Sequence, residues 1–216
     1  MPALLEWVHP DAYGGLAGRE CLEAAWEAQF DIEDAMLSKR EHTQIDTDYD
    51  KFYDTFDTEF FTHLYNEVGL PSDLADCTNY LYSNIQRRIK IGKHMGQPIK
   101  SNRGAGQGDS LSTIGALIIT TIQFKVIKEQ FPEVNLGSII DDRNFRGPGH
   151  EVIGAVRAAL KFDKMAGLVN NMSKFVAMST SEHMREILKK TDFDGHKIRV
   201  ALTDTLGGTT ITTLSL

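Results

Sequence analysis

The chain has 216 residues, of which 41% are hydrophobic and 25% charged, and a formal net charge of −7. This composition permits one domain with a real core and excludes a largely disordered chain. The longest strongly apolar stretch, residues 114–122, is too short to span a bilayer, no signal peptide is visible, and no histidine pairs with a cysteine at zinc spacing. We therefore expect an intracellular protein with no membrane partner, in which Cys21 and Cys77 are buried thiols rather than a disulfide.

The first part of the chain predicts three helices and one extended segment. After Gly18, apolar residues recur at helical spacing with acids mostly on the other faces, a pattern typical of an amphipathic helix: Leu22, Trp26, Phe30 and Leu37. Residues 42–48 look extended. A second helix ends near residues 69–71, and Ser72 is the predicted N-cap of a third helix that runs to about Asn84.

The second part alternates strands and helices without a regular β-α-β order. Two short strands flank a glycine turn in residues 86–100, and Asp109 or Ser110 caps a long buried helix. Residues 134–145 predict a hairpin with Asp141 and Asp142 near its tip. A helix over residues 150–166 ends at Gly167, and a strand at 175–178, a helix at 181–190 and a terminal β pair follow. This order predicts an α+β fold.

Charge is unevenly distributed along the chain. Residues 1–76 hold 18 acids and 4 bases, a net charge of −14, whereas residues 77–216 have a net charge of +7. No acid lies between Cys77 and Gly108, and the basic residues there are Arg87, Arg88, Lys90, Lys93, Lys100 and Arg103. Such a strip either binds a phosphate backbone beside a metal site or is an ordinary solvated hairpin.

The stretch DTDYDKFYDTFD, residues 46–57, places five carboxylates within twelve residues. Its acids fit several ligand positions of an EF-hand calcium loop. However, Lys51 stands where that loop needs a glycine for its sharp turn, and Asp57 stands where it needs a longer, bidentate Glu. Both departures argue against a calcium loop.

A second acidic site and a glycine-rich turn offer another interpretation. Asp141 and Asp142 follow apolar residues of strand type, and acids brought together on adjacent strands repel one another unless a divalent cation lies between them. Mg²⁺ prefers such oxygen ligands. The glycines of residues 103–112 allow close backbone approach to a ligand, but their spacing matches neither a dinucleotide fingerprint nor a Walker loop.

Together and in this order, these segments resemble the reverse transcriptases, and among them the enzymes of non-LTR retrotransposons. Residues 48–54, DYDKFYD, resemble the pattern D-x-x-K-A-F-D; residues 104–112, GAGQGDSLS, resemble G-x-x-Q-G-x-P-L-S; and residues 139–142, IIDD, are similar to F/Y-x-D-D. Residues 167–174, GLVNNMSK, resemble G-L-x-x-N-x-x-K, and Leu206-Gly207 resembles the "L-G" of the primer grip. Upstream, Tyr13-Gly-Gly and Gly18-Arg19 resemble the segment before the first catalytic Asp.

The resemblance implies RNA-directed DNA synthesis from dNTPs, on an RNA template and a DNA primer, by a two-metal mechanism with Mg²⁺ or Mn²⁺. It implies that Asp48, Asp141 and Asp142 are the metal ligands and that Lys174 is a candidate proton donor to pyrophosphate, although a merely exposed lysine fits equally well. Tyr53 matches the aromatic residue beneath the incoming sugar. Gln107 and Gly108 match the nucleotide-contacting turn. The basic residues Arg87, Arg88, Lys90, Lys93 and Arg103 are the expected nucleic-acid contacts.

The implied architecture is a polymerase palm, a small antiparallel sheet packed on helices, at residues 46–216, preceded by partial fingers at residues 1–45. We expect a truncated chain without a thumb, whose missing parts belong to a longer parent protein. Ile139 replaces the usual aromatic residue, Ser110 the usual proline, and Asn170 a commonly apolar residue. The alternatives are a decayed palm that folds or binds nucleic acid without catalysis and a viral RNA-dependent RNA polymerase. The latter typically has an Asn on the helix after the glycine turn, and residues 111–123 contain none.

Overall fold

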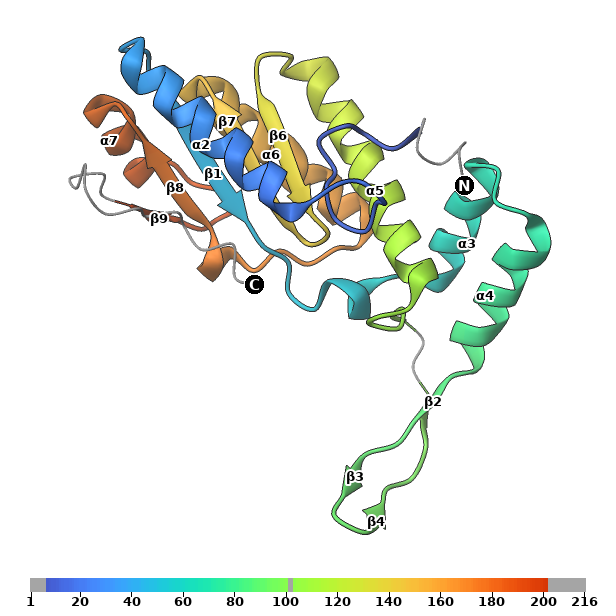
Figure 1. Ribbon diagram of the computed structural model, residues 1–216. Helices are drawn as coiled ribbons and strands as arrows, with labels where there is room; N and C mark the ends of the chain where they lie inside the picture. The colour runs from blue at the N-terminus through green and yellow to red at the C-terminus, as the bar shows by residue number, and fades with distance from the viewer. Residues whose placement is uncertain (1–6, 101–102, 202–216) are drawn as a thin grey trace.

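The computed structural model describes residues 7–100 and 103–201. A five-stranded sheet in the order β6-β7-β1-β8-β9 forms its centre (Figure 1). The strands are β1 Thr43–Thr47, β6 Asn135–Ile139, β7 Asp142–Gly147, β8 Val176–Ser179 and β9 Arg199–Val200. All neighbours pair antiparallel except β8 and β9, which are parallel, so the predicted antiparallel sheet is in fact mixed.

Helices cover both faces of the sheet. Helix α6, Gly149–Ala166, packs on β1 and β7, while α2, Cys21–Leu37, crosses the opposite face over β6 and β7 (Figure 1). On β1, Ile45 is fully buried in a core that also contains Phe145, Val156 and Phe175. Because side chains alternate along a strand, Gln44 and Asp46 project to the α2 face. Helix α7, Glu182–Lys190, packs against β8 and β9.

Helix α5, Ser110–Gln130, connects this core to a second one. It buries Phe124 and Ile127 in the first cluster and Ile118 and Ile119 in the second. The predicted nine-residue apolar stretch therefore lies within a 21-residue helix that is long and apolar enough to cross a membrane by length and composition. Within the fold, 61% of its apolar span is buried, which is the pattern of a core helix.

The second core is built from two short helices, α3 Thr58–Glu67 and α4 Ser72–Asn84, which pack on each other. Phe61 and Tyr65 of α3 pack there with Phe56, and the rings of Phe56 and Phe61 are stacked with centroids 4.0 Å apart. A hairpin then projects away from the body of the molecule (Figure 1). It consists of four two-residue strands, β2 Gln86–Arg87, β3 Lys90–Ile91, β4 His94–Met95 and β5 Ile99–Lys100.

Several sequence predictions need correction. Helix α2 forms, but its apolar residues Leu22, Trp26, Phe30 and Leu37 are exposed, and Ala24 and Ala35 are buried instead. Ser72 is the first residue of α4, after Pro71 at the N-cap. Cys21 and Cys77 are free thiols as expected, but both are exposed, since each lies on the outer side of its helix. Leu206-Gly207, which resembles the "L-G" of the primer grip, lies outside the described residues.

Candidate active site

Three carboxylates predicted from separate motifs meet at one end of β1 and β7. Thr47 pairs with Arg143, so Asp48, the residue after β1, lies level with Asp142, the first residue of β7. The alternation of side chains places Asp48 and Asp142 on the same face of the sheet. Asp141 occupies the tight turn between β6 and β7, directly beside them.

The electrostatics of these groups reflect their proximity. Burial, followed by the charges of Asp141 and Asp48, raises the pKa of Asp142 to about 6. Burial raises the pKa of Asp141 as well, and Asp48 adds to that shift. Carboxylates that raise one another's pKa hold unfavourable negative charge, which a cation at the same place relieves.

Lys174 supplies such a cation. Its Nζ lies 2.5 Å from Asp48 Oδ2, and the hydrogen bond and charge of Asp48 raise the pKa of Lys174. The charges of Asp142 and Asp141 act in the same direction. The lysine side chain is 62% exposed and the Asp48 side chain only 15%, so the ammonium group reaches a half-enclosed carboxylate from the solvent side.

Backbone pairing explains how Lys174 reaches this position. Asp50 N donates to Val169 O at 2.8 Å, and Asn171 N donates to Asp48 O at 2.9 Å. These bonds hold the GLVNN segment along the residues that follow β1. The 3-10 helix η2, Met172–Lys174, then ends at the lysine. The segments DYDKFYD and GLVNNMSK, more than a hundred residues apart, are therefore one structural unit.

The Asp141 turn is held from the N-terminal side. Tyr13 N donates to Ser138 O at 2.8 Å, and Ser138 N donates to Asp11 O at 3.0 Å. A Cβ on Gly14 would lie 2.6 Å from Cγ1 and 2.8 Å from N of Ile140, so only glycine fits there. Ile140 itself has φ +58°, an uncommon conformation for a β-branched residue. Tyr13-Gly14 thus acts as a support for a strained turn beside the carboxylates.

The glycine-rich turn is attached to the segment after Asp48. Ala105 N donates to Tyr53 O and Gly104 N to Phe56 O, both at 2.8 Å. Gly104 has φ +102°, and a Cβ there would lie 3.2 Å from Asp54 Cα, which explains the glycine. Asp109 then caps α5 by accepting from Leu111 N at 3.1 Å, as predicted.

This arrangement brings the predicted nucleotide contacts to the same region. Tyr53 is half-buried, its hydroxyl interacts with the Thr113 side chain, and the charge of Asp141 acts on it. Burial is the main cause of its raised pKa. Gln107 and Gly108 are exposed at the turn, and Gly108 has φ +84°. Tyr53 therefore lies between the carboxylates and the first turn of α5.

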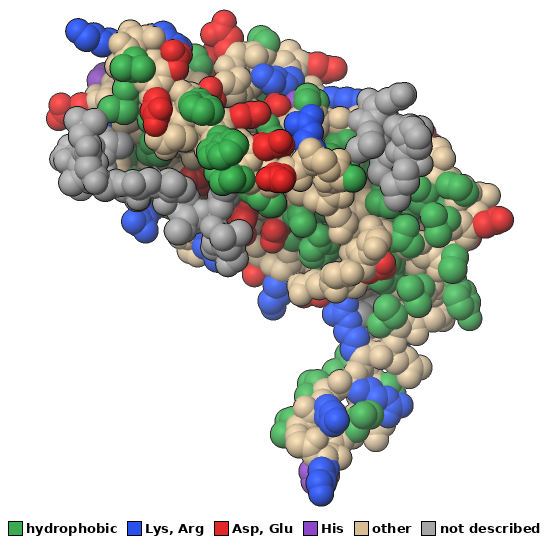
Figure 2. Space-filling model, in the orientation of Figure 1, with side chains coloured by type: hydrophobic (Ala, Val, Ile, Leu, Met, Phe, Trp, Pro, Cys, Tyr) green, Lys and Arg blue, Asp and Glu red, His purple; other side chains and the backbone are tan. Residues whose placement is uncertain are grey.

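The predicted basic residues form two groups rather than one strip. Arg87 lies 3.3 Å from Asp54, and Arg103 lies 3.7 Å from Asp57, so both are near the base of the hairpin and pair with the acidic stretch. Arg88, Lys90 and Lys93 are exposed farther out. Figure 2 shows Lys and Arg side chains along the projecting hairpin, together with apolar ones.

The acidic stretch does not form an EF-hand loop. Lys51 adopts the left-handed conformation that an EF-hand loop reaches with glycine, but the chain then enters the 3-10 helix η1, Phe52–Thr55. Asp57 caps α3 by accepting from Glu59 N and Phe60 N, both at 3.1 Å. Asp46 accepts from the Gln44 side chain at 2.8 Å. These carboxylates therefore serve different local roles.

The carboxylates suit a divalent metal in their chemistry, but their side chains are not arranged as a metal site. Across residues 7–100 and 103–201, no group of three or more His, Cys, Asp or Glu side chains is arranged as a metal site. Asp48 instead faces the Lys174 ammonium group. The donor chemistry nevertheless suits Mg²⁺ or Mn²⁺, because the charge of Asp48 adds to the raised pKa of both Asp141 and Asp142, and a hard cation prefers carboxylate oxygen.

A buried polar network beneath this site was missed by the sequence analysis. Asp163 of α6 is 2% exposed and accepts from Tyr49 Oη and Gln123 Nε2, both at 2.7 Å, and from Asn170 Nδ2 at 3.0 Å. The positive charge of Arg143 acts to lower the pKa of Asp163, and its guanidinium lies over the Tyr49 ring, 4.4 Å from the centroid. Burial raises the pKa of Asp163 to about 6 and lowers that of Arg143 to about 10.

This network contacts the site through chain neighbours. Tyr49 follows Asp48, and Arg143 follows Asp142. Asn170, which departs from the family pattern, is required here because an apolar residue would leave an Asp163 oxygen without its donor. One feature of the sequence indicates this network. Asp163 continues, four residues farther along α6, the apolar series of residues 152, 156 and 159 on the buried face of the helix.

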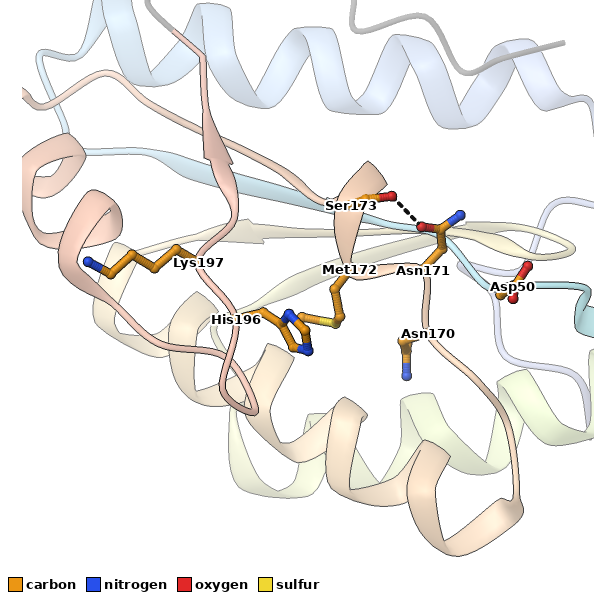
Figure 3. Close-up of a pocket in the computed structure, with 7 residues that line it drawn as sticks. All are labelled: Asp50, Asn170, Asn171, Met172, Ser173, His196 and Lys197. Atoms are coloured by element: carbon orange, nitrogen blue, oxygen red, sulfur yellow. Dashed lines mark hydrogen bonds between the residues drawn. The ribbon is translucent and has the colours of Figure 1, made fainter.

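A shallow pocket of about 440 Å³ lies on the other side of the GLVNNMSK segment (Figure 3). It is lined by Asp50, Asn170, Asn171, Met172, Ser173, His196 and Lys197. Ser173 Oγ donates to Asn171 Oδ1 at 2.6 Å within it. None of the predicted site residues lines this pocket, so it lies beside the carboxylates rather than being formed by them.

The geometry and the fold define a class: an α+β palm like that of reverse-transcriptase-type polymerases. Among solved structures, the chain is similar to telomerase from Candida tropicalis truncated from its C-terminal domain, with a TM-score of 0.61 and 16% identity over 79% of this chain and 36% of that one. Telomerase from the same organism, complexed with a TWJ fragment of telomeric RNA, gives a TM-score of 0.63 and 15% identity over 81% and 31%. The corresponding Candida albicans complex gives 0.53 and 11% over 85% and 33%.

The chain spans about a third of the length of these telomerases. At such identities the likeness establishes the fold alone. No protein-family model and no curated protein matches the sequence.

Proposed function

We propose that this chain is the palm of an RNA-directed DNA polymerase, from a retrotransposon-like element, and that it transfers nucleotides from dNTPs to a DNA primer on an RNA template. The observation that carries the proposal is the convergence of Asp48, Asp141 and Asp142 with Lys174 on a reverse-transcriptase-like fold. The telomerase structures solved with RNA support a nucleic-acid partner.

In this proposal the three carboxylates hold Mg²⁺ or Mn²⁺, which supplies activation of the primer 3′-hydroxyl and neutralisation of the triphosphate when bound. Lys174 donates a proton to the leaving pyrophosphate, a role that suits an exposed ammonium group beside Asp48. Tyr53 packs beneath the incoming sugar, and Gln107 and Gly108 contact the nucleotide from the exposed turn. Arg87, Arg88, Lys90, Lys93 and Arg103 bind backbone phosphates.

The remaining fingers and thumb belong, in this proposal, to a longer parent protein, since the chain spans only about a third of the telomerases it resembles. A second candidate is a palm that binds nucleic acid without catalysis. The contact of the Lys174 ammonium group with Asp48, where the proposal places a metal, favours that alternative.

Primer extension tests the proposal. The purified chain is incubated with an RNA template, a labelled DNA primer and dNTPs, in Mg²⁺ or Mn²⁺, and binding of the same template–primer is measured in parallel. Extension that is lost in Asp141→Ala and kept in Asp76→Ala, an exposed acid on α4, supports the polymerase. Binding without extension supports the non-catalytic palm, and extension with NTPs in place of dNTPs supports an RNA polymerase.

A further inference from the structure

Helix α2 is oriented opposite to an ordinary surface helix. Its apolar side chains face outward, and Leu22, Trp26, Phe30 and Leu37 are 51%, 57%, 64% and 85% exposed. At 100° per residue these four side chains fall within a sector of about 80° on the helix. They therefore form one continuous apolar stripe, which we call the α2 stripe. Exposed apolar stripes of this kind mark interaction surfaces.

The opposite side of α2 explains the orientation. Ala24 and Ala35 are buried there, which lets the helix approach the sheet closely. Asp31 and Glu27 also turn inward, toward Arg146 of β7, with which they pair at 3.0 Å and 3.8 Å. The Arg146 side chain is only 2% exposed and needs these carboxylates. Rotating the helix to bury the α2 stripe would leave this guanidinium without its acidic partners.

The charges around the α2 stripe restrict its occupant. Residues 21–37 contain five acids and no base. Glu23 and Asp34 lie along one flank, and Glu33 lies within the stripe. Figure 2 shows acidic side chains among the apolar ones over this helix. A nucleic acid or an anionic membrane is repelled by such a surface, and a second copy of α2 would bring five acids against five.

We propose that the α2 stripe is a docking site for a basic amphipathic helix of another polypeptide. Such a helix covers Trp26 and Phe30 with its apolar side and places Lys or Arg against Glu23, Glu33 and Asp34. Large aromatic residues at the centre and opposite charges at the rim are the usual division of roles in helix-to-helix recognition. The inference does not depend on polymerase activity, because it is drawn from the exposure and charge of α2 itself.

The experiment uses the intact chain with Trp7→Phe, which leaves Trp26 as the single tryptophan. The probes are two synthetic 18-residue helical peptides with leucines at i, i+4, i+8 or at i, i+3, i+7 and lysines on both flanks. For each, a matched peptide has glutamates in place of the lysines. We expect at least one lysine peptide to shift Trp26 emission to the blue and to bind at least tenfold more tightly than its glutamate counterpart.

Variants locate the interaction. Phe30→Ser with Leu37→Ser should weaken binding tenfold or more, and since both side chains are largely exposed, the fold should persist. Met165→Ser with Val169→Ser, which removes exposed apolar side chains elsewhere, is the matched control and should leave binding unchanged. Glu33→Lys should weaken binding of the lysine peptides and strengthen binding of the glutamate peptides.

Equal binding of both peptide types, or binding insensitive to the α2 substitutions, overturns the proposal. Self-association of the chain that these substitutions abolish also overturns it in favour of a second copy.

Discussion

The ammonium group of Lys174 lies 2.5 Å from Asp48 Oδ2, so a cationic side chain contacts one of the three carboxylates to which we assign the metal. The charges of Asp141 and Asp142 act on the same lysine. Lysine and a divalent cation therefore compete for one negative site. This relationship leads to a prediction that separates metal binding from catalysis.

Lys174→Gln should bind Mn²⁺ more tightly than the unaltered chain in the absence of nucleotide, by roughly fivefold, because the competing charge is gone while the carboxylates remain. Electron paramagnetic resonance titration of free Mn²⁺ measures this directly. Lys161→Gln, an exposed lysine on α6, serves as the control and should not change the affinity. Unchanged or weaker Mn²⁺ binding in Lys174→Gln would contradict the assignment of the site.

The raised pKa of Asp142, about 6, predicts a pH-dependent effect on stability. A carboxyl whose pKa is higher in the folded than in the unfolded state destabilises the fold when it ionises, and this effect sets in as the pH rises from about 4 through 6. Without metal, Asp142→Asn should therefore be more stable than the unaltered chain at pH 7.5, by about 1 kcal/mol after allowance for solvent screening. The difference should vanish near pH 4.

Urea unfolding in the presence of EDTA, at pH 4 and pH 7.5, measures this difference. Asp76→Asn on α4 is the matched exposed control. If Asp142→Asn is less stable at pH 7.5, or if the difference does not change with pH, the three carboxylates do not interact as the structure indicates.

The fold was largely predictable because its helices and hairpin depend on local signals. Helix α5 begins after Asp109, its predicted N-cap. Helix α6 ends at Gly167 as predicted, and this glycine adopts the left-handed conformation. The meeting of Asp48 with Asp142 followed from the family resemblance, and the register of β1 and β7 agrees with it. The metal assignment and the roles of Gln107 and the hairpin bases stay predictions.

What the sequence did not predict depends on contacts between distant residues. The orientation of α2 is decided by Arg146, more than a hundred residues away, whose burial outweighs the local amphipathic pattern. The Asp163 network likewise joins α5, α6 and β7 with Tyr49 and Asn170, which lie outside the helices and strands, so no local window contains it. The support of Ile140 by Gly14 is of the same kind, because a glycine's close contact is invisible until its partner is known.

Gly14→Ala should disturb the Asp141 turn, because the added Cβ would meet Ile140 Cγ1 at 2.6 Å and Ile140 N at 2.8 Å. We expect primer extension to fall by about tenfold or more, as a misplacement of about 1 Å in a catalytic group commonly causes. Adding Ile140→Gly removes the side-chain clash and the strain of φ +58°, and should restore part of the activity. A Gly14→Ala chain with full activity would show that this contact does not position Asp141.

Asn170 and Asp163 should be energetically coupled, because the Asn170 amide donates to a carboxylate that is 2% exposed. Asn170→Ala should destabilise the fold by about 1–3 kcal/mol, since it leaves a buried oxygen without its donor. Asp163→Asn alters the same hydrogen bond from the other side. The double variant should be more stable than the sum of the two single effects predicts, by about 1 kcal/mol.

Urea unfolding of the four chains measures this coupling. The matched control cycle uses Asn171→Ala in place of Asn170→Ala, and it should show additive effects because the Asn171 side chain pairs with Ser173 instead. Additive effects for Asn170 as well would mean that the buried network does not link the GLVNNMSK segment to α6, and the backbone bonds of that segment to Asp48 and Asp50 would then account for its position.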